Sequence, residues 1–221
     1  MEHRIRVKAI ENVTYNVKRF QCEKPAGYTY IPGQATDVAI GKEGWETEKR
    51  PFTFTSLTES PFLEFTIKMY HDHRGVTNEL DTLQVGDELI IDDAWGAIEY
   101  RGSGYFIAGG AGITPFIAIL RQLRKENKLA GNKLFFSNRT EKDIIIQAEL
   151  RAMLCSDAIF TITAGPSDQY YNGFIDESFL KTYVDDFSKH FYLCGPPKME
   201  EALQDTLIRL GASPDTVVFE K

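Results

Sequence analysis

A glycine-rich run follows a short apolar stretch near the middle of the sequence. Residues 105–108 are apolar throughout, which predicts a buried strand, and residues 109–112 continue it as Gly-Gly-Ala-Gly. Apolar residues then recur at helical spacing over 116–123, with Thr114 as the expected N-cap and Pro115 as the first helical residue. A strand, a glycine turn and a helix start together favour a bound pyrophosphate, because the backbone can approach it and the helix terminus attracts anions. A plain tight turn would show the same pattern.

A second group of reactive side chains follows another apolar run, at residues 191–193. The sequence there is Cys194, Gly195, Pro196, Pro197, Lys198 and Met199, and it begins a further predicted helix. A thiol at the carboxyl end of a strand can lie against a flat ring without adding charge, at the edge where open α/β sheets bind ligands. The alternative is a buried structural cysteine, which is the usual fate of this residue.

The third group lies in the first half of the chain, where Arg50, Pro51, Phe52 and Thr53 are consecutive. Arginine offers a bidentate fork for a diphosphate. Phe52 offers an apolar plane for an aromatic ring, and Thr53 offers a hydroxyl and an amide. Taken alone, the same four residues also fit an ordinary strand that carries one exposed arginine.

The elements that must position these groups differ between the two halves. The first hundred residues are predicted as short strands separated by turns, with apolar side chains alternating at 63, 65, 67 and 69, which indicates an antiparallel barrel or sandwich. After residues 101–104 the pattern changes to alternating strands and helices, with strands near 133–136, 159–162 and 191–193 and a last helix over 199–210. This pattern predicts a parallel sheet. We expect two domains, 1–101 and 102–221.

Composition excludes several classes of function. The 221 residues carry a net charge of −7, whereas nucleic-acid binding needs a basic face, so no nucleic-acid partner is expected. Three widely spaced cysteines do not supply the ligands of an iron–sulfur cluster or a structural zinc, so no metal is expected. The sequence contains no run of about 18 apolar residues, so no membrane span is expected. The first residues lack the apolar segment of a signal peptide, which favours the cytoplasm.

Together, and in this order, the three groups resemble the motifs of the ferredoxin–NADP reductase superfamily. The flavin motif of that family is Arg-x-Tyr-Ser/Thr, its nucleotide motif is Gly-x-Gly-x-x-Pro, and its late motif is Cys-Gly-Pro-Pro-x-Met. They match residues 50–53, 110–115 and 194–199. The resemblance covers essentially the whole chain. It implies an FAD-binding β-barrel over 1–101 and a Rossmann-like NAD(P)-binding α/β domain over 102–221.

The resemblance also implies roles for individual residues around FAD. Arg50 would hold the pyrophosphate, Phe52 would stack on the isoalloxazine in place of the usual Tyr, and Thr53 would hydrogen-bond flavin N5. Further FAD contacts are implied for Pro51, for the strand residues Ile67, Lys68 and Met69, and for a second phosphate-binding stretch, Arg74, Gly75, Val76 and Thr77.

On the nucleotide side, the resemblance implies that the nicotinamide nucleotide contacts Gly112, Thr114, Cys194, Gly195 and Pro196, with Cys194 beside the ring. Ser137 and Arg139 follow the second strand of the back domain, where relatives bind the adenine ribose. Arg139 would pair with a 2′-phosphate, which slightly favours NADPH. The same segment also resembles NADH-dependent cytochrome b5 reductases, so both nucleotides stay open.

The end of the sequence departs from the family pattern. Many members end in Glu-x-aromatic, with the Glu beside the nicotinamide ring and the aromatic over the flavin. Glu220 matches the Glu and is a candidate catalytic residue, but the sequence stops at Lys221, before the aromatic. We expect a more accessible flavin face, unless Phe219 covers it or the natural chain is longer.

The function implied is an NAD(P)H-dependent flavoprotein reductase. It would pass a hydride from NADH or NADPH to FAD and electrons onward to a separate acceptor protein, such as a flavodoxin, a ferredoxin, a haem protein or an oxygenase component. Hydride transfer between stacked rings depends mainly on positioning. Two alternatives stay open: a free-flavin or quinone reductase, and an electron-transfer subunit that binds FAD without using a nicotinamide nucleotide.

Overall fold

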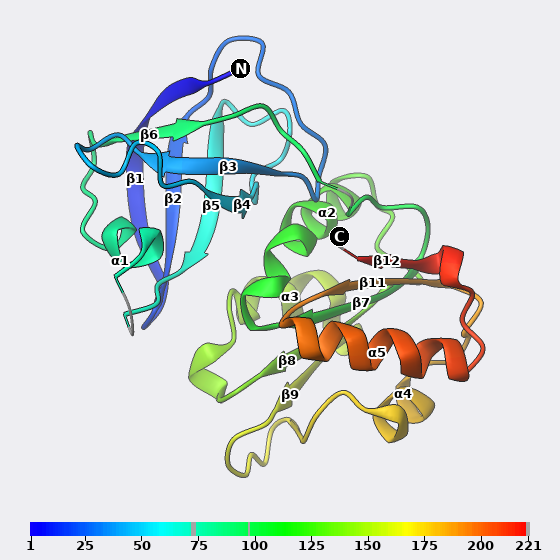
Figure 1. Cartoon of the computed structure of the whole chain (residues 1–221). Coiled ribbons are helices and arrows are strands. Elements are labelled where there is room, and N and C mark those ends of the chain that lie inside the picture. The colour runs from blue at the N-terminus through cyan, green and yellow to red at the C-terminus, as the bar shows by residue number, and fades with distance from the viewer. Residues whose placement is uncertain (72–73, 97, 220–221) are drawn as a thin grey trace.

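The first half of the chain forms one antiparallel sheet in the computed structural model, which describes residues 1–71, 74–96 and 98–219. Its strands are β1 (His3–Thr14), β2 (Val17–Glu23), β3 (Ala35–Ile40), β4 (Arg50–Thr53), β5 (Phe62–Lys68) and β6 (Glu88–Ile91), in the order β4-β3-β6-β1-β2-β5. An antiparallel bridge between Phe54 and Phe65 joins the two ends of the sheet. The sheet therefore closes into the predicted barrel (Figure 1).

The alternation predicted for β5 is present in the barrel core. Leu63, Phe65 and Ile67 are buried and pack with side chains from β1, β2 and β3. Helix α1 (Val76–Leu80) packs Val76 and Leu80 into the same core. Gly75 is its N-cap.

The second half forms a parallel sheet of the predicted Rossmann-like kind. Its strands are β7 (Gly104–Gly109), β8 (Lys133–Asn138), β9 (Ala158–Ile162), β10 (Tyr171–Asn172), β11 (His190–Cys194) and β12 (Val217–Phe219). All five pairings are parallel, in the order β10-β9-β8-β7-β11-β12. We call this sheet and its helices the α/β half.

Helices cover both faces of the parallel sheet (Figure 1). Helices α2 (Thr114–Lys125) and α3 (Gln147–Leu154) pack into one core, and α4 (Glu177–Tyr183) and α5 (Pro197–Arg209) pack into the other. Each helix has a strongly apolar face, which the sheet buries. Among the described residues, no helix has the length and hydropathy needed to cross a bilayer.

Two local predictions are wrong in detail. Gly110–Ile113 form a 3-10 turn, and α2 begins at Thr114, with Ile113 as its N-cap. The Thr114 hydroxyl donates to the carbonyl of Ala111 at 3.0 Å instead of capping the helix, because the glycine turn already runs into it in a helical conformation. Helix α5 begins at Pro197, two residues earlier than predicted.

The predicted boundary between residues 101 and 102 stays a prediction, although the two sheets lie on either side of it. The backbone N–H groups of Arg101 and Gly102 both donate to the Tyr192 hydroxyl, at 2.9 and 3.0 Å. Tyr192 belongs to β11, so the α/β half holds the connection between the two sheets.

Candidate functional site

The strand order of the parallel sheet reverses between β7 and β11. Strands β8, β9 and β10 lie on one side of β7, and β11 and β12 lie on the other. Open α/β sheets bind ligands in the crevice at the carboxyl ends of the strands at such a point. Here the two strands end in Gly109 and Cys194, so the glycine-rich turn and the Cys194 motif are neighbours.

Close packing between these two motifs explains two of the glycines. A β-carbon on Gly112 would overlap with the carbonyl oxygen of Cys194 and would lie 2.7 Å from the amide nitrogen of Gly195. A β-carbon on Gly109 would lie 2.6 Å from the Met199 sulfur. These glycines therefore let the two motifs approach each other, a role that we did not predict from the sequence.

Gly110 differs from its neighbours, because it has space around it. Its φ is +54°, and a β-carbon there would meet no atom within 4 Å. It lies on the wall of a cavity, where a missing side chain leaves the backbone open to a ligand. The glycine turn thus combines tight packing at two positions with an exposed backbone at a third.

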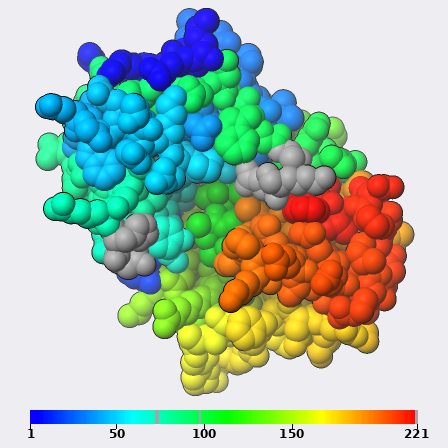
Figure 2. All heavy atoms as spheres, in the orientation of Figure 1, coloured from blue at the N-terminus to red at the C-terminus, as the bar shows by residue number. Residues whose placement is uncertain are grey.

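A cavity of about 430 Å³, which we call the inner cavity, lies between the barrel and the α/β half. The two halves leave a hollow between them on the face shown in Figure 2. The barrel contributes residues of β4 and β5, and the α/β half contributes both motifs. The lining residues are Ala35, Pro51, Phe52, Thr53, Thr66, Ile67, Lys68, Tyr70, Thr77, Gly109, Ala111, Gly112, Thr114, Cys194, Gly195 and Pro196.

A second cavity of about 640 Å³, the outer cavity, adjoins the first. It runs over the ends of β8 and β9 toward α4 and α5, and its lining includes Ser137, Arg139, Phe174 and Lys198. Both cavities share a set of wall residues, which are Lys68, Tyr70, Gly109, Ala111 and Pro196. The two cavities therefore form one groove across the switch point of the sheet.

The predicted flavin-side residues fall into two groups. Pro51, Phe52, Thr53, Lys68 and Thr77 line the inner cavity. Ile67 also lines it, but its side chain is buried in the barrel core. The remaining predicted flavin residues, which are Arg50, Met69, Arg74, Gly75 and Val76, are not among the described lining residues of either cavity.

Arg50 and Met69 illustrate where these residues lie. The Arg50 side chain is exposed, donates to the Lys49 carbonyl at 2.7 Å and lies 3.8 Å from a Glu48 carboxylate oxygen. Met69 is buried in the barrel core, and so is Val76.

The predicted nucleotide-side residues match the cavities more closely. Gly112, Thr114, Cys194, Gly195 and Pro196 all line the inner cavity, and Ser137 and Arg139 line the outer one. The N–H of Gly195 donates to Oε1 of Glu200 at 2.7 Å. Glu200 lies in the first turn of α5. This bond fixes the start of the helix next to the half-buried Cys194.

A buried carboxylate supports the Arg139 side of the outer cavity. Asp143 Oδ2 accepts from the Thr140 backbone at 2.9 Å and from its hydroxyl at 2.6 Å, and Oδ1 accepts from the Tyr15 hydroxyl at 2.7 Å. Burial alone would raise the pKa of Asp143, but these hydrogen bonds and the charge of Lys68 lower it below its usual value. Asp143 is therefore ionised at neutral pH, and it joins the β1–β2 turn to this wall.

Sequence reasoning missed several wall residues. Tyr70 lines both cavities, and Thr66 lines the inner one from β5. Phe174 has 71% of its surface exposed and lines the outer cavity. An aromatic residue directly after Gly173 was the available signal. Lys198 lies within the Cys194 motif and lines the outer cavity.

The candidate Glu220 lies outside the described residues. Phe219, the alternative cover for the flavin, belongs to β12 and packs against the core that contains α4 and α5. It lines a separate pocket with Arg101 and Ile208. The described part of the chain therefore places Phe219 away from the inner cavity.

The residues present fit FAD and a nicotinamide nucleotide. The inner cavity offers an aromatic plane at Phe52, hydroxyl groups at Thr53 and Thr66, and a cation at Lys68. The exposed backbone of Gly110 suits a phosphate group, and the exposed ring of Phe174 and the Arg139 cation line the adjoining wall. Flat rings, phosphates and a ribose each meet groups that can bind them.

Comparisons with known proteins agree with this geometry. Residues 106–205 match the family model of the oxidoreductase NAD-binding domain. The reductase component of propane 2-monooxygenase from Rhodococcus jostii is 27% identical over 99% of this chain. NADH-cytochrome b5 reductase 2 from Gallus gallus is 26% identical, over 91% of this chain and 80% of its own length. The chain spans 63% of the length of the Rhodococcus protein, less than two thirds.

The fold is also similar to that of solved structures. A ferredoxin NADP+ reductase from Neisseria gonorrhoeae, with bound FAD and NADP, superimposes with a TM-score of 0.87 at 18% identity, over 99% of this chain and 98% of that one. The match covers both halves of this chain. In its fold, its motifs and these similarities, the chain resembles the ferredoxin–NADP reductase superfamily of NAD(P)H-dependent flavoprotein oxidoreductases, which use FAD with NADH or NADPH.

Proposed function

We propose that this chain takes electrons from NAD(P)H and delivers them through FAD to a separate acceptor protein. The observation that carries the proposal is the continuous groove, in which the inner and outer cavities share Lys68, Tyr70, Gly109, Ala111 and Pro196. FAD against the barrel wall and a dinucleotide along the α/β wall would meet where these residues lie. Positioning of the two rings is then the main contribution of the protein.

When bound, FAD would supply a ring that accepts a hydride from NAD(P)H, leaving NAD(P)+, together with a proton from solvent. The reduced ring can then release its electrons one at a time. The chain's own residues bind and orient. We assign the flavin ring to Phe52 and Thr53, and the nicotinamide to Thr114 and Cys194. Arg50 would have to leave the Lys49 carbonyl to reach a pyrophosphate, which a change of side-chain rotamer allows.

Arg139 supports a preference for NADPH. It lines the outer cavity with Ser137, and no carboxylate of the described residues lies within ion-pair distance of it. Two carboxylates on the same cavity wall are engaged elsewhere. Asp176 caps α4 through the Phe179 N–H at 2.8 Å, and Glu177 pairs with Lys181 and Arg209. A 2′-phosphate beside Arg139 would therefore find an unpaired cation.

The acceptor that we propose is a one-electron carrier. Two of the similar proteins are named as a component of an oxygenase and a reductase of cytochrome b5, so a haem protein or an oxygenase component joins flavodoxin and ferredoxin as a candidate. In this proposal the acceptor is a separate partner protein.

Anaerobic mixing of the FAD-loaded protein with NADPH or NADH tests the proposal. We expect loss of the flavin absorbance band within the dead time or the first seconds, followed by reoxidation when cytochrome b5, flavodoxin or ferredoxin is added. A flavin that stays oxidised with both nucleotides would refute nicotinamide activity. It would favour the alternative of an electron-transfer subunit that binds FAD without using a nicotinamide nucleotide. Rapid reoxidation by free flavin or a quinone, but by none of the proteins, would favour the reductase of small molecules.

A further inference from the structure

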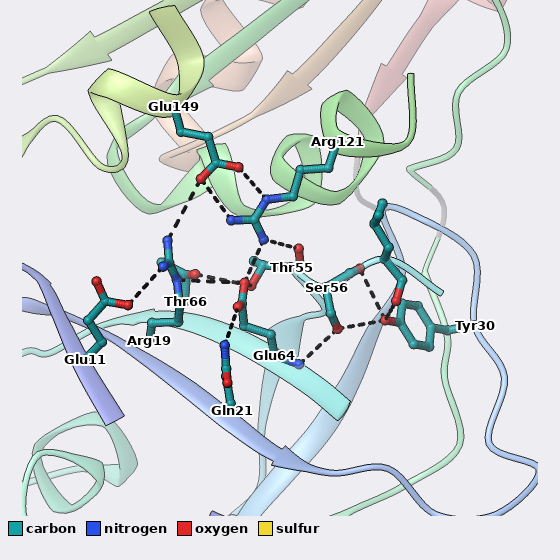
Figure 3. A network of polar contacts seen from close by, with 11 residues as sticks. Glu11, Arg19, Gln21, Tyr30, Thr55, Ser56, Glu64, Thr66, Arg121 and Glu149 are labelled. Carbon is teal, nitrogen blue, oxygen red and sulfur yellow. Dashed lines mark hydrogen bonds and ion pairs between the residues drawn. The ribbon is translucent and has the colours of Figure 1, made fainter. Parts of the chain in front are cut away.

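Helix α2 carries an arginine that bonds to both halves of the molecule. Arg121 faces the barrel in Figure 3 and donates to acceptors on three residues. Its Nη1 donates to Glu64 Oε1 of β5 at 2.7 Å and to the Thr55 carbonyl at 2.7 Å. Its Nε and Nη2 donate to the two carboxylate oxygens of Glu149 in α3, at 2.6 and 2.9 Å. One guanidinium thus joins two helices of the α/β half to the barrel.

The Glu64 side chain is the barrel's part of this arrangement. Only 6% of its surface is exposed, compared with 19% for Arg121 and 29% for Glu149. Its carboxylate accepts from the Thr55 hydroxyl at 2.9 Å, and its backbone N–H donates to the Ser56 hydroxyl at 3.0 Å. Few rotamers satisfy all of these bonds, so Glu64 presents its charge to α2 in a fixed direction.

A second arginine lies beside the first. Arg19 of β2 pairs with Glu11 at 3.0 Å, and its guanidinium nitrogens lie 3.8 Å from Glu64 Oε1 and 4.0 Å from Glu149 Oε2. We call Arg19, Arg121, Glu64 and Glu149 the bridging cluster (Figure 3). The positive charges of the two arginines neutralise the negative charges of the two carboxylates at the interface between the halves.

The bridging cluster is connected to both walls of the inner cavity through short lengths of chain. Thr66, Ile67 and Lys68 line that cavity and follow Glu64 on the same strand. On the other wall, Thr114 lines the cavity from the first turn of α2, about two helical turns before Arg121. A strand and a helix are stiff over such distances. A shift at the cluster would therefore change the width of the cavity.

Arg121 and Glu149 of the cluster stabilise each other's charged form. Burial alone would lower the pKa of Arg121, but the carboxylates of Glu149 and Glu64 raise it above its usual value. Burial alone would raise the pKa of Glu149, but the hydrogen bond from Arg121 lowers it. Loss of either partner would leave a half-buried charge without its counter-ion, which favours separation of the two halves.

The two halves also share apolar contacts. The barrel has its own core, and the core that contains α4 and α5 draws only on the α/β half, but the core that contains α2 and α3 also takes in Val17 of β2. Further described polar links across the interface include an exposed ion pair, Lys125 with Glu59, and the Tyr15–Asp143 hydrogen bond. The bridging cluster adds part-buried charged bonds to these contacts, and such bonds require a specific placement of the two halves.

We propose that Arg121 is a positioning residue that fixes the spacing between the flavin wall and the nucleotide wall, and thereby sets the rate at which NAD(P)H reduces the flavin. This inference rests on the proposed function. It predicts that breaking the Arg121–Glu64 bond slows reduction at saturating nucleotide, while the affinity for each nucleotide changes much less. A displacement of about 1 Å in a reactive pair costs about 100-fold in rate, which is the expected upper size of the effect.

The test compares Arg121→Met, Arg121→Lys and Glu64→Gln with the matched control Lys125→Met, which breaks the exposed ion pair from the same helix. Reduction of bound FAD is followed by anaerobic stopped flow with NAD(P)H and with the C4-deuterated nucleotide. Arg121→Met and Glu64→Gln are expected to be slower and to show a larger isotope effect. Arg121→Lys keeps the charge but cannot bond both carboxylates, so an intermediate rate is expected. Lys125→Met is expected to match the wild type.

A distance measurement supplies a readout that needs no activity. Spin labels are placed on Cys155 and on Val85→Cys, both exposed, in a Cys194→Ala background. Arg121→Met is expected to broaden and lengthen the distance distribution between the halves, with Lys125→Met as the control. Glu64→Gln gives the same information if Arg121→Met does not fold.

The outcomes are separable. Wild-type rates, isotope effects and distances in Arg121→Met and Glu64→Gln would overturn the proposal, and so would a slower rate without any change in the distances. If the wild-type flavin is not reduced by either nucleotide, the proposed function is wrong and so is the effect on rate. The distance distribution then still decides whether Arg121 holds the two halves together.

Discussion

Gly112 and Cys194 lie in contact through their backbones, because a β-carbon on Gly112 would overlap with the Cys194 carbonyl oxygen. Gly112 lies in the turn between β7 and α2, and Cys194 ends the neighbouring strand β11, shortly before α5. The absence of a side chain at Gly112 therefore brings the two nucleotide-side motifs together. A phosphate-binding glycine and a packing glycine cannot be told apart in the sequence, but here the geometry assigns Gly112 to packing.

Gly112→Ala should destabilise the fold and disturb the nicotinamide side of the inner cavity. Overpacking of this kind costs about 1–3 kcal/mol, because backbone atoms must move. Urea unfolding and the rate of flavin reduction measure the two effects. The matched control is Gly110→Ala, whose β-carbon meets no atom within 4 Å, so its cost is the smaller one of a positive φ. Equal stability of wild type and Gly112→Ala would contradict the assignment.

Arg50→Ala tests the flavin motif. If Arg50 turns to the FAD pyrophosphate, loss of a charge-assisted hydrogen bond, worth about 1.5–3 kcal/mol, should weaken FAD binding by about 10–100-fold. Fluorescence titration of the apoprotein with FAD gives the dissociation constant. Lys42→Ala, which removes another ion-paired cation of the barrel, is the control. An unchanged constant would show that Arg50 keeps its contact with the Lys49 carbonyl when FAD binds.

Arg139→Ala tests the choice of nucleotide. The Michaelis constant for NADPH should rise by about 10-fold or more, and that for NADH should change little, because only NADPH carries the 2′-phosphate that a cation would pair with. Lys142→Ala removes a nearby cation that is not among the lining residues of the outer cavity. Equal effects on the two nucleotides would show that Arg139 does not recognise the phosphate.

Much of this arrangement follows from contiguous sequence. Three short stretches, 50–53, 109–115 and 194–199, each contain both the reactive residues and the residues that determine the local backbone. The change from strands alone to alternating strands and helices indicates the antiparallel barrel and the parallel α/β sheet. Thr114 is the first residue of α2 and not its predicted N-cap, because the 3-10 turn Gly110–Ile113 runs directly into the helix. That detail depends on φ angles that glycine leaves undetermined in the sequence.

Contacts between distant residues were not predictable from the sequence. Glu64 and Arg121 are 57 positions apart, and each alone reads as a polar residue on the exposed face of its element. Tyr70 and Phe174 line the groove together only because the segment after β5 and a loop of the α/β half both reach the outer cavity. Periodicity assigns such residues to a face but not to a partner.

The three cysteines should differ in reactivity toward iodoacetamide. Burial raises the pKa of Cys22 to about 12, so its thiolate is scarce and its access is blocked. Cys155 is exposed and should be alkylated first, whereas Cys22 should react only after denaturation. Cys194 lines the inner cavity, so FAD with NADP+ should slow its modification without affecting Cys155. Peptide mass spectrometry gives each rate, and equal protection of Cys155 would contradict this placement.

The Tyr15–Asp143 hydrogen bond should give the fold a stabilisation that disappears in acid. The pKa of Asp143 is lower in the folded protein than its ordinary value of 3.8, despite burial, because Thr140 and Tyr15 donate to the carboxylate. A carboxylate with a lowered folded pKa contributes stability that is fully present above the unfolded pKa and is lost as the pH falls through the folded one. Tyr15→Phe should therefore cost about 1 kcal/mol at pH 5–8 and progressively less below pH 4.

Urea unfolding of wild type and Tyr15→Phe, at pH values from 3 to 8, measures this difference. The matched control is Tyr170→Phe, whose hydroxyl accepts from the neutral side chain of Gln147, so its cost should not depend on pH in this range. A cost of Tyr15→Phe that stays constant down to pH 3 would show that Tyr15 stabilises the fold through packing alone. A cost that falls with the protonation of Asp143 would identify this bond as a charged link between the barrel and the wall of the outer cavity.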